Sequence, residues 1–320
     1  MGRVVRLLLA AVVAVGGIGY GAASAFVWDK LTRVPGGCHT EWLTNDPTHF
    51  AYEPPVQFDT SPYRMPAPED VRFPSRDPAI SISGWWIPAG NEAPAVVVVH
   101  GHTACKRDPA VLLAAGMLHR AGISALLIDL RDHGDSTVED GRYAGGTEEY
   151  RDVLGAWDWL RTDRSIAVDR IGLLGISLGA ATVMIATGEE PRVVATWEDS
   201  SYADIGVAIE AELRRNGYPT ILEFGGVTMA RLISGDDLTS LSPLGAVAKM
   251  TGRRLFITHG TADQRLSVTY GRQLLAAAQA DGVKVDAWFV DGAGHTEAIR
   301  LHATDYADRL GTFFEGALAR

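Results

Sequence analysis

The chain has 320 residues, of which 47% are hydrophobic and 21% charged, so it is long enough and apolar enough to bury a substantial core. This composition argues against disorder over most of the length. The formal net charge of −10, with no basic run, argues against a nucleic-acid partner, because phosphate backbones repel such a protein.

Residues 1–28 form a hydrophobic N-terminal segment. Arg3 and Arg6 precede an uncharged stretch, Leu7–Trp28, which is long enough to cross a bilayer as a helix. Ala23-Ser24-Ala25 has the form that a signal peptidase accepts, so the segment is either a membrane anchor or a cleaved signal peptide. We favour the anchor, because a cleaved signal usually has a shorter apolar core, and we expect the segment to lie outside the fold. Both alternatives place the remaining residues outside the cytoplasm, as a membrane-anchored or a secreted protein.

Residues 29–70 form a second segment that is rich in proline, which predicts an extended, irregular lead-in. It contains Cys38, and the other cysteine of the chain is Cys105. In an exported protein the two could form a disulfide, or each could be a separate small buried residue. Neither cysteine has the spacing of a metal site.

From about residue 71 to residue 320 the pattern is that of one α/β domain. Ile80–Pro88 begins with period-two alternation, which predicts an antiparallel edge strand. Continuous apolar runs then alternate with helical patterns, which predicts a mostly parallel central sheet with helices on both faces. The predicted strands are Ala95–Val99, Ser124–Leu130, Arg170–Ile176, Val193–Trp197, Arg254–Thr258 and Val285–Val290. The predicted helices are Pro109–Ala121, Thr147–Leu160, Leu178–Thr187, Val268–Ala280 and Ala298–Ala317.

The interval of about residues 201–250 interrupts this alternation. Unstructured loops of such length are rare, so two weakly amphipathic stretches, Asp204–Arg215 and Thr220–Ile233, predict a helical insertion. The insertion could be a lid over a pocket or an elaboration of the scaffold. Its apolar side chains could line an acyl pocket or form a small core: Ile205, Ile209, Leu213, Ile221, Leu222, Phe224, Met229, Leu232 and Ile233.

A Gly-x-Ser-x-Gly pentapeptide, Gly175-Ile176-Ser177-Leu178-Gly179, lies between a predicted strand and a predicted helix. The glycines permit a tight turn that exposes the serine hydroxyl, so Ser177 is the candidate nucleophile. A serine hydroxyl needs a histidine base, and the histidine needs an acid to orient it.

His295, which follows the last predicted strand, is the candidate base. The later His302 falls inside the last predicted helix, where a surface or packing role is expected. Asp263, after the penultimate strand, is the candidate acid, with a role as a turn or cap residue as its alternative. Asp199, after the preceding strand, is the second candidate acid.

Acyl transfer also needs donors aimed at the developing oxyanion. We assign these to the backbone N–H groups of Leu178, which follows the serine, and His102, which lies in the loop after Ala95–Val99. His100 and His102 without an acidic third ligand nearby are a poor metal signal. We therefore predict chemistry that uses no cofactor and no metal.

These motifs together resemble the α/β-hydrolase superfamily. The resemblance rests on His100-Gly101, the pentapeptide at 175–179, His259-Gly260-Thr261-Ala262-Asp263, Gly294-His295, Ser242-Pro243 and the D-x-R-x-x-G-x-S segment Asp129–Ser136. It covers roughly residues 70–318 and is most similar to bacterial serine esterases and to the serine-aminopeptidase-like or dienelactone-hydrolase-like branches. It implies that Ser177, Asp263 and His295 form a catalytic triad and that His102 and Leu178 supply the oxyanion amides.

The sequence thus predicts a serine hydrolase that cleaves small-molecule carboxylic esters through an acyl-enzyme. A peptidase, thioesterase or acyltransferase could use the same residues, and Glu198 or Glu210 could then bind a free amino terminus. The alternative of another class is a non-catalytic surface protein that binds a ligand.

Overall fold

In the computed structural model, which describes residues 2–34 and 36–318, an eight-stranded sheet forms the centre of the molecule. The order of its strands is β1-β2-β4-β3-β5-β6-β7-β8. The first two strands are antiparallel to their neighbours, and β3 to β8 are parallel. The strands are β1 (Glu69–Pro74), β2 (Ser81–Ile87), β3 (Ala95–Val99), β4 (Ser124–Ile128), β5 (Ile171–Ile176), β6 (Ala195–Asp199), β7 (Arg254–Gly260) and β8 (Lys284–Val290).

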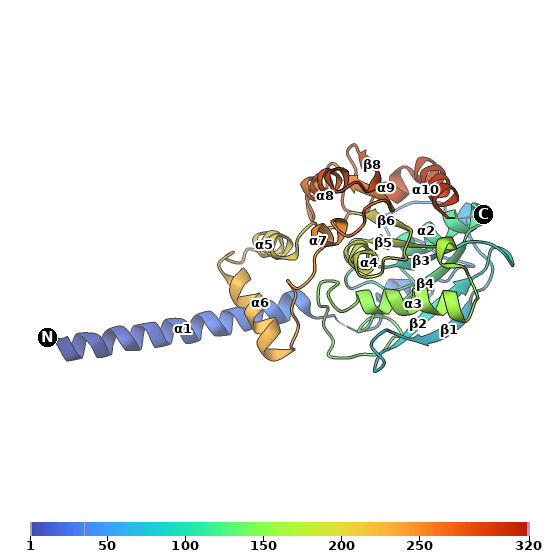
Figure 1. The fold of residues 1–320 in the computed structure, drawn as a ribbon. Coiled ribbons are helices and arrows are strands. Elements are labelled where there is room, and N and C mark those ends of the chain that lie inside the picture. Colours follow the sequence, from blue (N-terminus) through green and yellow to red (C-terminus); the bar gives the residue numbers. More distant parts are fainter. Residues whose placement is uncertain (1, 35, 319–320) are drawn as a thin grey trace.

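Helices cover both faces of the sheet (Figure 1). On one face, α2 (Pro109–Arg120) and α10 (Ala303–Ala317) pack over the central strands. On the other face lie α3 (Tyr150–Thr162), α4 (Leu178–Glu189) and α8 (Val268–Ala280). The central strands β3, β4 and β5 are buried along their whole length, as their continuous apolar runs require. The predicted α/β-hydrolase fold class is therefore confirmed.

Two local predictions are wrong. The strand predicted over Ile80–Pro88 is antiparallel, but it is not the edge of the sheet, because β1 pairs with its outer side. In β1 the buried residues Val71 and Phe73 alternate with exposed residues. This strand pattern is short and adjoins the proline-rich lead-in, so the sequence analysis did not predict β1. The single helix predicted over Ala298–Ala317 is interrupted at His302, whose non-helical backbone separates α9 (Ala298–Leu301) from α10.

The interval of residues 201–250 is helical, and it contains α5 (Ile205–Arg215), α6 (Leu222–Ile233) and α7 (Pro243–Val247). Some of its apolar side chains, including Ile205, Leu213 and Leu222, are buried in small cores. Others remain in solvent: Ile221, Phe224, Leu232 and Ile233 are all more than half exposed.

The N-terminal segment forms one long helix, α1 (Gly2–Thr32), which extends away from the body of the molecule (Figure 1). It is the one helix in the described residues that is long and apolar enough to cross a membrane. Residues 2–19 are all exposed, but Val27 and Trp28 are buried. The prediction that this segment lies outside the fold therefore holds only for its first two thirds, because its last turns pack against α6 and the residues near Arg142.

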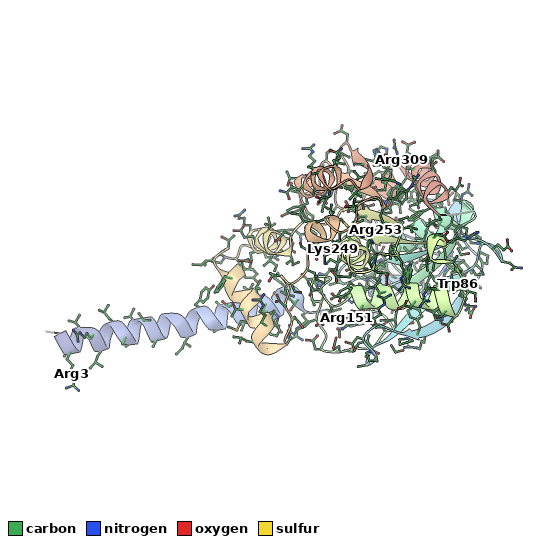
Figure 2. The ribbon with its side chains drawn as sticks, in the orientation of Figure 1. Arg3, Trp86, Arg151, Lys249, Arg253 and Arg309 are labelled. Atoms are coloured by element: carbon green, nitrogen blue, oxygen red, sulfur yellow. A yellow bond between two sulfur atoms is a disulfide. The ribbon has the colours of Figure 1, made fainter. Side chains whose placement is uncertain are left out.

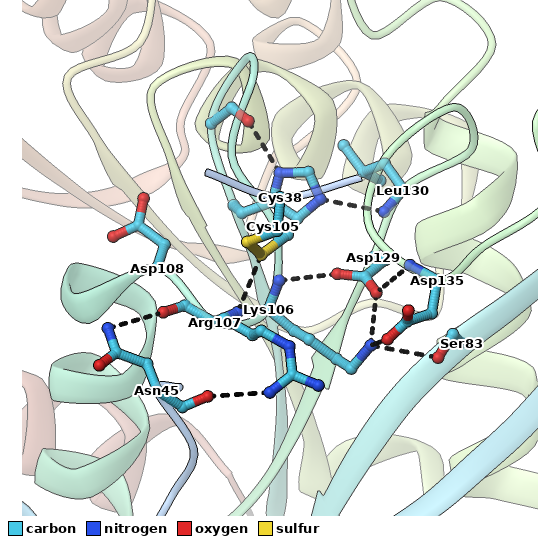
Figure 3. The surroundings of a disulfide bond; sticks show 12 residues. Cys38, Asn45, Ser83, Cys105, Lys106, Arg107, Asp108, Asp129, Leu130 and Asp135 are labelled. Carbon is cyan, nitrogen blue, oxygen red and sulfur yellow. Dashed lines mark hydrogen bonds and ion pairs between the residues drawn. A yellow bond between two sulfur atoms is a disulfide. The ribbon is translucent and has the colours of Figure 1, made fainter. Parts of the chain in front are cut away.

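Cys38 and Cys105 form a disulfide, with their Cα atoms 5.5 Å apart (Figure 3). It joins the lead-in to the loop after β3. The next residue, Lys106, is buried, and its ammonium group lies 2.5 Å from Asp129 and 2.6 Å from Asp135. The same loop is therefore held on one side by a covalent bond and on the other by a buried ion pair.

Removal of the disulfide, in a double variant Cys38→Ala/Cys105→Ala, is expected to lower the free energy of unfolding by about 2–4 kcal/mol. The bond closes a loop of 67 residues, and opening it increases the conformational freedom of the unfolded chain. Denaturant unfolding of the oxidised wild type, the reduced wild type and the variant measures this loss. Equal stability of oxidised and reduced wild type would contradict the prediction.

Candidate active site

Ser177 lies on a sharp turn between β5 and α4. Its backbone has φ of 57°, a conformation that is uncommon for residues other than glycine. A Cβ on Gly175 would lie 2.1 Å from the carbonyl oxygen of Gly179, and one on Gly179 would lie 2.4 Å from that of Val99. The two glycines of the pentapeptide therefore allow the backbone contacts that hold the turn and present the Ser177 hydroxyl.

The structure brings Ser177, His295 and Asp263 into one hydrogen-bonded line. Nε2 of His295 lies 2.9 Å from Oγ of Ser177, and Nδ1 of His295 lies 2.7 Å from Oδ2 of Asp263. Ser177 follows β5, His295 follows β8 and Asp263 follows β7. All three residues therefore lie at the carboxyl edge of the sheet. His295 is partly exposed, whereas the side chain of Asp263 is fully buried.

The carboxylate of Asp263 is held by several donors. Its Oδ1 accepts hydrogen bonds from the backbone N–H groups of Arg265 and Leu266, at 2.8 and 2.9 Å. Burial acts to raise the pKa of Asp263, but hydrogen bonds from His259 and His295 outweigh it and hold the pKa well below its usual range. Asp263 is therefore ionised at neutral pH and can orient and stabilise a protonated His295.

His259 is a second histidine at Asp263 that the sequence analysis quoted but gave no role. Its Nε2 donates to the carbonyl oxygen of Leu266 at 2.8 Å and lies 3.3 Å from Oδ2 of Asp263. Burial acts to lower the pKa of His259, but the contact with Asp263 and the nearby Glu198 raise it overall. His259, four residues before Asp263 in β7, thus places a second imidazole against the carboxylate of the acid.

The two residues expected to supply the oxyanion amides, His102 and Leu178, both lie in the wall of the cavity that contains Ser177. Leu178 is the first residue of α4. The loop before His102 lies close to Ser177, since a Cβ on Gly101 would lie 3.2 Å from Cβ of Ser177. Among the described residues, neither N–H donates a hydrogen bond to another group, so both remain available to a ligand.

The other sequence candidates lie apart from this line. The carboxylate of Asp199 accepts hydrogen bonds from Ser200 and Tyr306, at 2.8 and 3.0 Å, and not from His295. Glu198 is fully buried, which raises its pKa to about 8, and it accepts a hydrogen bond from the Ser201 amide. Glu210 pairs with Arg214 on the surface of α5, so neither glutamate lines the Ser177 cavity.

The cavity at Ser177 has a volume of about 160 Å³. Its walls include several residues that sequence reasoning missed: Lys30, Leu31, Tyr143, Tyr202, Glu212, Asn216 and Arg265. Glu212 supplies a carboxylate to the wall, and Arg215 and Arg265 lie 3.2 and 3.9 Å from it. Lys30 and Leu31 belong to α1, so the long N-terminal helix contributes directly to the cavity.

Both ring nitrogens of His100, the first histidine after β3, have hydrogen-bond partners within the protein. His100 is buried, and its Nδ1 donates to the Gly101 carbonyl while its Nε2 accepts from the Leu130 amide. Burial lowers the pKa of His102 to about 3, so its ring is neutral. Within residues 2–34 and 36–318, three side chains could hold a metal ion together, His39, Glu41 and Glu53, and they lie in the lead-in away from the Ser177 cavity.

Comparison with curated proteins finds partial relatives. An uncharacterized 31.7 kDa protein of Escherichia coli is 25% identical over 174 residues, which cover 53% of this chain and 54% of that protein. A polyketide transferase of Stachybotrys chlorohalonatus is 31% identical over 129 residues, which cover 40% of this chain and 42% of that protein. The chain thus spans about half the length of these curated relatives.

Comparison with solved structures finds the same fold. An esterase of Pyrococcus furiosus superimposes with a TM-score of 0.65 at 21% identity, covering 86% of this chain and all of that chain. An acylaminoacyl peptidase of Pyrococcus horikoshii superimposes with a TM-score of 0.60 at 20% identity, covering 78% of this chain and 41% of that chain. Residues 115–319 match the sequence profile described as the prolyl oligopeptidase family. This match takes in more than half of the chain, which therefore belongs to the prolyl oligopeptidase family of the α/β-hydrolase superfamily.

Proposed function

We propose that the protein is a serine hydrolase that cleaves carboxylic esters through an acyl-enzyme. The observation that carries this proposal is the hydrogen-bonded line from Ser177 through His295 to a buried, ionised Asp263. This line has the geometry of a nucleophile, a general base and an orienting acid. Membership of a family of α/β hydrolases supports the same conclusion.

In the proposed reaction, Ser177 Oγ attacks the acyl carbonyl while Nε2 of His295 takes the hydroxyl proton. The N–H groups of His102 and Leu178 stabilise the oxyanion, and Asp263 stabilises the imidazolium. His295 then protonates the alcohol as it leaves, and the acyl group stays on Ser177. In the second half, His295 deprotonates a water molecule that attacks this acyl-enzyme, which releases the acid and restores Ser177.

A peptidase is the second candidate function. The carboxylate of Glu212 in the cavity wall could pair with the amino terminus of a peptide, and the matched family is described as that of prolyl oligopeptidase. Against this, Arg215 and Arg265 already lie beside Glu212, so its charge is balanced within the protein. We therefore favour an uncharged acyl ester as the substrate.

Turnover of matched esters and amides separates the two candidates. The purified full-length chain is expected to react with a fluorophosphonate probe and to hydrolyse a p-nitrophenyl acyl ester faster than the p-nitroanilide of the same acyl group. A clear preference for N-terminally free aminoacyl anilides would favour the peptidase. Failure of the folded protein to react with the probe would leave a non-catalytic, ligand-binding role as the better account.

We also propose an arrangement of the chain with respect to the membrane. Residues 1–28 act as an anchor, residues 29–70 as a lead-in, and residues 71–320 as the catalytic domain with residues 201–250 as its lid. The length and apolar surface of α1 support the anchor, and the disulfide supports an oxidising compartment outside the cytoplasm. A signal peptide remains the alternative, and the mass of the mature N-terminus distinguishes the two.

A further inference from the structure

The outer face of α6 carries a stripe of apolar side chains that no other part of the described chain covers. Ile221, Phe224 and Leu232 are 72%, 73% and 72% exposed. Their spacing places them on one side of the helix, opposite the buried residues Leu222, Gly226 and Ala230. Thr228 lies between Phe224 and Leu232 on this side and is its polar member. Large apolar side chains exposed together on one side of a helix mark an interaction surface, because water-exposed helix faces are ordinarily polar.

The helix that carries the stripe, α6, crosses α1 (Figure 1). The hydroxyl of Tyr20 donates a hydrogen bond of 2.8 Å to the Ile221 carbonyl oxygen, so the start of α6 is fixed at the level of Tyr20. Gly225 packs directly on Ser24, since a Cβ there would lie 2.0 Å from the Ser24 hydroxyl oxygen. The crossing therefore lies between residues 20 and 27 of α1.

The length of α1 predicts that the surface of a bilayer lies at the level where α6 crosses α1. A hydrocarbon core about 30 Å thick needs about 20 helical residues. Arg3, at the free end of α1 (Figure 2), and Arg6 mark the inner boundary, so the outer boundary falls between about residues 23 and 26. This is the stretch that α6 crosses.

We propose that the stripe of Ile221, Phe224 and Leu232 docks into the surface of the bilayer that α1 crosses, and that the Ser177 cavity takes acyl esters from that bilayer. The occupant is the lipid surface, because α1 fixes α6 at the depth where the headgroups meet the acyl chains. Apolar side chains of a helix lying in this layer are stabilised by burial among the lipids. The substrate part of the inference rests on the proposed esterase function.

The position of the cavity fits this source of substrate. Lys30 and Leu31 line the cavity about 5 residues, or roughly 8 Å, beyond the expected lipid boundary. Leu31, Tyr143, Ile205 and Ile209 also line a narrow second cavity of about 20 Å³ that reaches Gly226 and Val227 of α6. Apolar side chains thus join the surroundings of Ser177 to the inner face of the docked helix.

The docking is tested with the full-length protein in nanodiscs that contain nitroxide-labelled phosphatidylcholine. A fluorophore is attached at Phe224→Cys or, as a control, at Leu301→Cys on α9, which lies far from α1 and α6 (Figure 1). We expect strong quenching at position 224 and little at position 301. Equal quenching at the two positions would overturn the docking, whether or not the protein is an enzyme.

The source of the substrate is tested with a triple variant, Ile221→Ser/Phe224→Ser/Leu232→Ser, in the same nanodiscs. Its turnover of bilayer-embedded p-nitrophenyl palmitate is expected to fall at least about tenfold, while turnover of soluble p-nitrophenyl acetate is unchanged. A control with three other exposed apolar residues replaced, Leu43→Ser/Val138→Ser/Leu301→Ser, is expected to change neither rate. Unaltered palmitate turnover in the first variant would overturn the inference, whereas absence of all turnover in the wild type would instead reject the esterase proposal.

Discussion

The Ser177→Ala variant is expected to lose ester turnover by roughly 10⁴- to 10⁶-fold and to lose all labelling by a fluorophosphonate probe. The alanine lacks the oxygen that forms the acyl-enzyme, so only binding and oxyanion stabilisation remain. Replacement of a hydroxyl by hydrogen introduces no steric conflict, so the fold is expected to survive. Initial rates with a p-nitrophenyl ester, together with probe labelling, measure the effect.

A matched serine provides the control for this prediction. Ser201 is also buried near the carboxyl end of β6, but its hydroxyl donates to the Tyr202 carbonyl oxygen and does not line the Ser177 cavity. The Ser201→Ala variant is expected to keep its probe labelling and most of its turnover. Full turnover in Ser177→Ala would show that another residue is the nucleophile.

The Asp263→Asn variant is expected to reduce turnover by about 10³- to 10⁴-fold with little change in substrate affinity. The neutral amide cannot stabilise the imidazolium of His295. Its NH₂ group takes the place of Oδ2 and donates toward Nδ1 of His295, which favours the tautomer with its proton on Nε2, and that tautomer cannot accept the proton of Ser177. The geometry of the site is nearly retained, so the loss should appear in kcat.

The Asp199→Asn variant is the matched control, because Asp199 is the second candidate acid from the sequence. Its carboxylate contacts Ser200 and Tyr306 in place of His295, so we expect this variant to keep its turnover within about tenfold of the wild type. The opposite ranking, with Asp199→Asn the more damaged variant, would reassign the acid. Thermal unfolding of both variants separates a loss of catalysis from a loss of fold.

Much of the fold could be predicted because the central strands are continuous apolar runs between recognisable turns. Ala95–Val99 and Ile171–Ile176 are buried on both faces, so a run without alternation identifies them. In contrast, β1 alternates weakly beside a proline-rich segment, and the interruption at His302 has no proline or glycine to signal it. Such boundaries depend on tertiary packing more than on local preference.

The candidate site likewise contains residues that could be predicted from the sequence and residues that could not. Ser177, Asp263 and His295 each follow a strand in a parallel sheet, so their sequence positions predict that they meet at one edge. Glu212 could not be found in this way, because α5 belongs to the insertion and not to the alternation of strands and helices. Arg265 lies only two residues after Asp263, in the loop after β7, but no motif marks it as part of the cavity wall. Lys30 and Leu31 were missed for a further reason. Nothing in the sequence of an apolar helix indicates which part of the folded domain its last turns will contact.

The segment Asp129–Ser136, one of the motifs behind the family resemblance, has a structural explanation. The carboxylate of Asp129 pairs with the buried Lys106, and the guanidinium of Arg131 pairs with the buried Asp152 at 2.8 Å. The Ser136 hydroxyl donates to the Asp129 carbonyl oxygen. These charges hold the loops after β3 and β4 together, so the segment supports the position of His102 without touching Ser177.

In the proposed membrane arrangement, the disulfide also limits how far residues 71–320 can move from the bilayer. Only five residues lie between Thr32, the end of α1, and Cys38, which is bonded to the loop after β3. Fully extended, the six steps from Thr32 to Cys38 span about 20 Å. If α6 dissociated from the lipid, this short connection would keep the entrance to the Ser177 cavity within a few nanometres of the surface. A lateral force on α1 would then reach the centre of the sheet through the disulfide as well as the lid through the contacts of α1 with α6.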